Sequence, residues 1–93
     1  MDWMNRPAEA TYDLHGQGVV EAVGNAEHFL RVQARVRRGR VVRLITGRGR
    51  AGGGAPVRTR VRTLLRALKA QGALVRDFVL EETDGSFLVL LAG

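Results

Sequence analysis

A carboxylate and an imidazole stand two positions apart near the start of the chain, as Asp13 and His15. They end a short strand-like run that begins at Thr11, and Gly16 follows directly. Side chains two positions apart on a strand share a face, so we expect Asp13 and His15 to be neighbours where the strand ends. A histidine titrates near neutral pH and can act as a general acid or base, while an aspartate can orient it or bind Mg²⁺. The pair is a candidate catalytic site.

A glycine-rich basic segment, Thr46-Gly47-Arg48-Gly49, follows a second apolar run later in the chain. Glycines let backbone N–H groups approach an anion closely, and a helix that starts beyond the loop turns its positive end toward it. Arg48 could bind a phosphate through two hydrogen bonds. We therefore expect Thr46, Gly47, Arg48 and Gly49 to hold phosphate. The alternative is a tight strand-to-helix turn with solvated arginines.

The elements around the two segments are predicted to bring them together. Apolar residues between Val19 and Arg38 recur at helical spacing, and this helix separates a strand over 11–15 from a strand over 40–46. The right-handed crossover of a strand–helix–strand unit places both strand ends at one edge of a parallel sheet. The acid, the imidazole and the glycine-rich loop should meet at that edge.

The rest of the chain completes a small α/β domain. Pro56 opens a second amphipathic helix that Gly72 closes, and strands over 74–82 and 86–91 flank an Asp-Gly turn. The order βαβαββ predicts a two-layer α+β sandwich, with two helices packed on a four-stranded mixed sheet. Residues 11–93 form the domain, and residues 1–10 are expected to be a flexible N-terminal arm. The sequence leaves open whether Trp3 packs on the domain or on a partner.

The charge of the chain is strongly positive and unevenly distributed. The 93 residues carry a net charge of +6, and no acidic residue occurs between Glu27 and Asp77. Such a block is expected to have no internal partners and indicates a polyanion, so we expect nucleic acid as the partner. An Arg-rich codon bias would explain the type of cation but not the missing acids. The cations expected to follow flanking phosphates are Arg50, Arg58, Arg62, Arg66 and Lys69.

Several classes of site are excluded or disfavoured by the residue types present. The chain has no cysteine, which excludes disulfides and thiolate metal sites. No apolar run is long enough to cross a bilayer, so we expect no membrane partner and a cytoplasmic location. The segment from Gly47 to Gly52 reads G-x-G-x-x-G, but more glycines precede the helix and no acidic residue follows at the ribose position. We therefore expect no nucleotide cofactor.

Two short segments resemble the signatures of the small MutS-related (Smr) domain. Tyr12-Asp13-Leu14-His15-Gly16 is similar to that family's Leu-Asp-x-His segment, and Ile45-Thr46-Gly47-Arg48-Gly49 to its Thr-Gly-x-Gly segment. The resemblance extends from Thr11 to Leu91, with Tyr12 where an aliphatic residue is usual. It implies the same order of elements, the sheet order first–second–fourth–third, and a fold similar to the C-terminal domain of a bacterial translation initiation factor. It also implies a nucleic-acid-binding and often nicking endonuclease domain.

The leading functional hypothesis is a stand-alone Smr-type endonuclease that nicks or cleaves structured or branched DNA or RNA, as in DNA repair or recombination. Asp13 and His15 would carry the catalysis. With few aromatic residues for stacking bases, recognition should rest on the phosphate backbone more than on sequence. The alternatives are a non-catalytic module that binds duplex nucleic acid or ribosomal RNA, and a protein-interaction domain. The sequence leaves open whether the substrate is DNA or RNA and whether cleavage requires a Mg²⁺ bound by Asp13. It also leaves open whether the domain forms a homodimer that cuts both strands.

Overall fold

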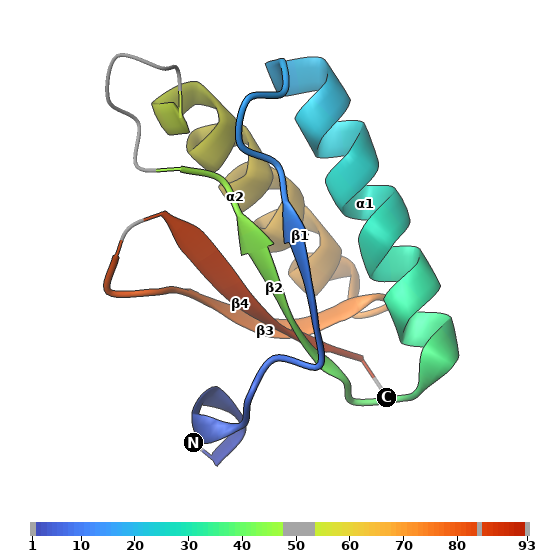
Figure 1. Ribbon diagram of the computed structural model, residues 1–93. Coiled ribbons are helices and arrows are strands. Elements are labelled where there is room, and N and C mark those ends of the chain that lie inside the picture. The colour runs from blue at the N-terminus through green and yellow to red at the C-terminus, as the bar shows by residue number, and fades with distance from the viewer. Residues whose placement is uncertain (1, 48–53, 84, 93) are drawn as a thin grey trace.

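Two helices cover one face of a four-stranded mixed sheet (Figure 1). The structure is a computed structural model that describes residues 2–47, 54–83 and 85–92, with only the backbone of residues 54 and 55. The expected order βαβαββ is confirmed, and a short 3₁₀ helix precedes it. The elements are η1 (Asp2–Asn5), β1 (Ala10–Asp13), α1 (Val19–Val36), β2 (Val41–Ile45), α2 (Gly54–Gln71), β3 (Val75–Leu80) and β4 (Ser86–Leu91).

The sheet order is β1-β2-β4-β3, as the resemblance implied. β1 and β2 are parallel, with Asp13 opposite Ile45, whereas β4 pairs antiparallel with both β2 and β3. The carboxyl ends of β1 and β2 therefore lie at one edge, together with the N-terminal ends of both helices (Figure 1). Both termini of the described chain lie toward the opposite edge (Figure 1). The predicted meeting of the two strand ends is confirmed.

Some element boundaries differ from those predicted. β1 ends at Asp13 and not at residue 15, and α1 ends at Val36, after which Gly39 reverses the chain at φ 70°. α2 begins two residues before Pro56. Proline is tolerated in a first helical turn because the N–H that it lacks has no partner there. β4 occupies the predicted residues 86–91.

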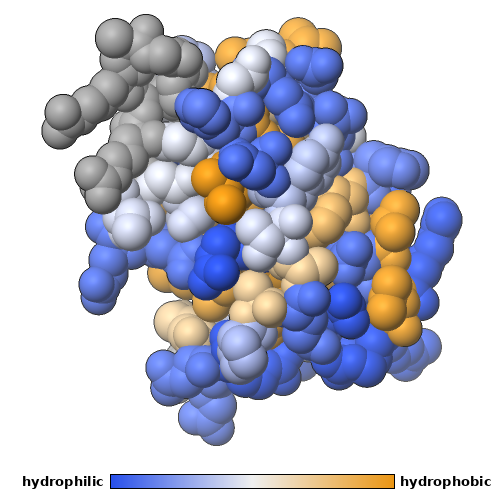
Figure 2. Space-filling view, in the orientation of Figure 1, coloured by the Kyte–Doolittle hydropathy of each residue, from blue (hydrophilic) through white to orange (hydrophobic). Residues whose placement is uncertain are grey.

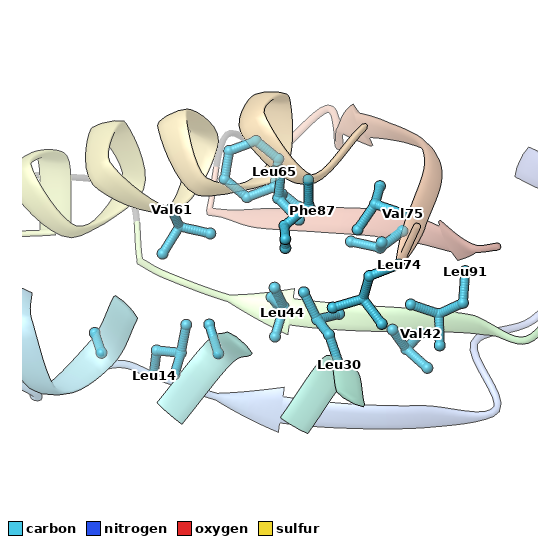
Figure 3. Close-up of a cluster of buried hydrophobic side chains, with 14 of the residues drawn as sticks. Leu14, Leu30, Val42, Leu44, Val61, Leu65, Leu74, Val75, Phe87 and Leu91 are labelled. Atoms are coloured by element: carbon cyan, nitrogen blue, oxygen red, sulfur yellow. The ribbon is translucent and has the colours of Figure 1, made fainter. Parts of the chain in front are cut away.

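The main core lies between the helices and the sheet (Figure 3). Leu30 of α1 and Leu65 of α2 are fully buried against Leu44 of β2 and Phe87 of β4. Along α2 the buried positions recur every three to four residues, as expected for a helix with one apolar face. These positions are Val57, Val61, Leu65 and Leu68. This core fixes the two helices on the sheet.

The other face of the sheet is covered in part by the N-terminal segment that we expected to be a flexible arm. Trp3 is buried and packs against Val41 and Leu88. Glu9 forms ion pairs with Arg37 and Arg40, so the segment is also joined to the turn between α1 and β2. The indole of Trp3 thus packs on the domain itself.

Candidate active site and nucleic-acid interface

Asp13 and His15 are joined by a turn and not by a strand. The carboxylate Oδ1 of Asp13 accepts a hydrogen bond from the backbone N–H of His15, at 2.8 Å. Between them, Leu14 is fully buried and its N–H donates to the Ile45 carbonyl. The argument from strand alternation is therefore wrong for His15, because the chain turns immediately after Leu14. The turn nevertheless keeps the two residues together, and both are exposed.

Asp13 projects from the face of the sheet opposite the helices. Its neighbour Tyr12 packs on the helix side, where its ring centroid lies 5.3 Å from that of Phe29 in α1. Since successive strand residues alternate, Asp13 lies on the other face. Its register partner Ile45 is the last residue of β2 and directly precedes Thr46. The two sequence segments are thus adjacent at one sheet edge.

Thr46 and Gly47 are anchored to the β3–β4 hairpin. Their two backbone N–H groups both donate to the carbonyl of Gly85, at 2.8 and 3.0 Å. Thr46 is only 2% exposed, and its Oγ1 lies 3.4 Å from the same carbonyl. These two amides are therefore engaged within the domain. Arg48, Gly49 and Arg50, predicted to contact phosphate, lie outside the described residues.

Gly85 is a residue whose role the sequence did not reveal. Its Asp-Gly turn signal predicted the hairpin, but not that the Gly85 carbonyl would face β2. The contact arises because β4 pairs with β2 in the register that sets Ser86 opposite Ile45. Gly85, which precedes Ser86, therefore lies beside Thr46, which follows Ile45. The start of the glycine-rich loop is positioned by this contact.

A comparison with known protein families matches the Smr domain to residues 12–92, which include both sequence signatures. This chain belongs to the Smr domain family. Among curated proteins, no match is found. Membership in the Smr family is consistent with nucleic-acid binding. Within this Smr domain, the charged residues differ in the partners that the fold gives them.

Many of the cations in the Smr domain have internal partners, which corrects the view that the basic block has none. Glu27 lies one helical turn from Arg31, whereas Glu9 and Glu81 are distant in sequence and reach their partners only in the folded chain. The described pairs are Arg31–Glu27, Arg37–Glu9, Arg40–Glu9, Arg43–Glu81 and Lys69–Asp77. These cations already have a carboxylate partner within the domain, so the cations that could contact an external anion are sought first among the remaining arginines.

One of these ion pairs, Arg43–Glu81, belongs to a hydrogen-bond network on the same sheet face as Asp13. Arg43 donates two hydrogen bonds to the Glu81 carboxylate, at 2.7 and 3.1 Å, and Ser86 donates a third at 2.7 Å. The hydrogen bonds from Arg43 are the main reason why the pKa of Glu81 lies below its usual value. The network joins Arg43 of β2 and Ser86 of β4 to Glu81, which directly follows β3.

The basic stripe of the Smr domain follows α2. The guanidinium carbon Cζ of Arg62 lies 5.9 Å from the ring centroid of Phe87. This contact holds the Arg62 side chain against the sheet. Arg66 is exposed, and Lys69 reaches Asp77 at 3.0 Å. Within the described part of the chain, neither Arg62 nor Arg66 has a carboxylate partner. Arg58 is half-buried nearer the loop edge. In the residues that the structure describes, Arg62 and Arg66 are thus two arginines of this stripe without an ion pair.

The described residues include no group of three or more His, Cys, Asp or Glu side chains that could hold a metal ion. A Mg²⁺ at Asp13 would therefore depend mainly on substrate phosphate and water for its ligands. In the same described residues, no helix is long and apolar enough to cross a membrane.

Proposed function

We propose that this Smr domain is an endonuclease that nicks or cleaves structured or branched DNA or RNA by way of its phosphate backbone. The observation that carries the proposal is the exposed His15, held beside Asp13 at the same sheet edge as the Thr46-Gly47 loop. An acid–base residue and a phosphate-binding loop at one edge are what phosphodiester hydrolysis requires.

In this mechanism His15 moves the proton. It accepts a proton from the attacking water, or it donates one to the oxygen that leaves when the phosphorus–oxygen bond breaks. Asp13 positions His15 through its main chain, and no other hydrogen bond to its carboxylate is found among the described residues. Its second oxygen is then available to a water or a Mg²⁺ on the substrate.

The loop would hold the scissile phosphate. Thr46 and Gly47 fix its start through Gly85, so the direct phosphate contacts are assigned to Arg48 and Gly49. Arg48 would stabilise the negative charge that grows on the phosphate oxygens in the transition state. Arg50, Arg58, Arg62, Arg66 and Lys69 would contact flanking phosphates, Lys69 in competition with its pairing to Asp77.

The test is cleavage of a supercoiled plasmid and of a structured RNA, each with Mg²⁺ or with EDTA. His15→Ala should lower the cleavage rate by about 10²- to 10⁴-fold. His28→Ala is the matched control, since His28 is an exposed histidine in the middle of α1 and should leave the rate unchanged. Cleavage that survives His15→Ala undiminished would remove the mechanism.

A second candidate is a non-catalytic module that binds duplex nucleic acid or ribosomal RNA. It is favoured by the structural tasks of the signature residues, since Asp13 caps a turn and Thr46 is buried. In that case neither wild type nor His15→Ala would cut, and both would bind with the same salt-sensitive affinity.

A further inference from the structure

An apolar hollow lies between the first turns of the two helices. It has a volume of about 550 Å³, is open to solvent, and borders the main core, against which Val19 packs. Its described lining residues are Val19, Val20, Pro56, Thr59 and Arg60. We call this hollow the base pocket.

Val20 is the residue that calls for an explanation. It is 84% exposed, the most exposed large hydrophobic side chain of the described residues. Figure 2 shows hydrophobic atoms at the upper end of the molecule, over the N-terminal turn of α1 and among hydrophilic ones. An exposed apolar side chain that lines a hollow together with an arginine favours a ligand that has both an apolar and an anionic part.

The position of the pocket connects it to the proposed active site. α1 begins shortly after His15, and α2 begins just beyond the glycine-rich loop. The first turns of both helices lie at the edge where β1 and β2 end (Figure 1). A ligand in the base pocket would therefore lie at the same edge as His15 and Thr46.

We propose that the base pocket receives one unpaired nucleobase of the bound nucleic acid. A base has apolar faces and a polar edge and is joined to phosphates on both sides. The pocket has matching groups, with Val20 and Pro56 for the face of the base, the Thr59 hydroxyl for its edge and Arg60 for a phosphate. Arg60 has no ion pair within the described part of the chain, so its charge is available.

This inference rests on the proposed nucleic-acid binding and narrows its substrate class. None of the described lining residues is aromatic, so the pocket suits a single base and not a stacked run. Taking a base out of a paired stack costs a few kcal/mol, and the cost is least where the base is already unpaired. The domain should therefore prefer nucleic acids with a bulge, loop or flap to a perfect duplex.

The experiment measures binding in EDTA by fluorescence anisotropy with three labelled duplexes: perfect, with a one-nucleotide bulge, and with the same bulge made abasic. The abasic bulge keeps the phosphates and the bend but lacks the base. The proteins are wild type, Val20→Ser and Val36→Ser. Val36 is the matched control, because it is also an exposed valine of α1 but lies at the other end of the helix.

Wild type should bind the bulge roughly five to ten times more tightly than the abasic bulge, which is the effect of burying one base face. Val20→Ser should bring this ratio close to one, whereas Val36→Ser should keep it. Equal wild-type affinity for both bulges, with salt-sensitive binding intact, would overturn the base pocket and leave the proposed function standing. An equal loss of this preference for the bulge in Val20→Ser and in Val36→Ser would also overturn the base pocket. Absence of binding to every duplex would instead remove the proposed function itself.

Discussion

Asp13 holds His15 by its main chain, through the hydrogen bond from the His15 N–H to the Asp13 carboxylate. An asparagine can accept the same hydrogen bond through its side-chain oxygen, whereas an alanine cannot. The two substitutions therefore separate the shape of the turn from the charge of the carboxylate.

We predict that Asp13→Asn keeps a cleavage rate within about tenfold of wild type, because the turn can still form. Asp13→Ala should fall toward the rate of His15→Ala. The pH profile of cleavage by Asp13→Asn should keep the same general form as that of wild type. If asparagine and alanine are equally inactive, the negative charge itself is needed, as it would be for Mg²⁺.

The basic stripe should determine the dependence of binding on salt. Replacing Arg62 and Arg66 together by glutamate should weaken binding and flatten the plot of log affinity against log salt by roughly 0.9 units for each phosphate that the protein no longer neutralises. The control replaces Arg35 and Arg38 by glutamate; both are exposed arginines near the end of α1. Equal effects of both double variants would show that only net charge matters.

Thr46 should contribute to the stability of the domain and not to nucleic-acid binding. Thr46→Val keeps the shape of the buried side chain but removes the hydroxyl that approaches the Gly85 carbonyl. We expect a decrease of about 1 kcal/mol in the free energy of unfolding, measured by urea denaturation, and unchanged nucleic-acid affinity. Weaker affinity at unchanged stability would instead mean that the hydroxyl contacts the substrate.

The Glu81 network should make the domain sensitive to acid. The pKa of Glu81 is lowered in the folded state, chiefly by the hydrogen bonds from Arg43. Its contribution is therefore complete above the unfolded-state pKa and is lost as the pH falls through the folded-state pKa. Glu81→Gln should lower Tm by about 4–8 °C at pH 7 and flatten the acidic limb of stability against pH. The control is Glu82→Gln, an exposed neighbour without a described ion pair, which should change neither.

The N-terminal segment should contribute to stability. Trp3→Ala removes a buried indole from its contacts with Val41 and Leu88 and should cost about 3 kcal/mol of unfolding free energy. Met4→Ala is the control, because Met4 is the neighbouring residue and is exposed. A Trp3→Ala variant as stable as wild type would support a loosely attached arm.

Features that depend on neighbouring residues, or on the geometry of a crossover, could be read from the sequence. The apolar run 86–91 after an Asp-Gly turn predicted β4 to the residue, and the parallel crossover predicted that the ends of β1 and β2 would meet. Partners far apart in sequence could not be read in this way. Arg43 and Glu81 meet only because β3 and β4 fold back beside β2.

The candidate site shows the same division. The types of Asp13 and His15 could be recognised from the sequence, but the way they are joined could not. Strand alternation does not hold beyond the point where Leu14 turns into the core and the chain leaves the sheet. Likewise, Trp3 has no periodic pattern around it, so only the folded sheet reveals the apolar surface on which it packs.

The placement of the two termini determines how the domain can be fused to another protein or immobilised. Both lie toward the edge of the sheet opposite the ends of β1 and β2 (Figure 1). A tag, a carrier protein or a solid support joined at either terminus would leave the edge that carries Asp13 and His15 facing away from the attachment. Immobilised or fused forms of the domain should therefore still admit a long, stiff polymer to that edge.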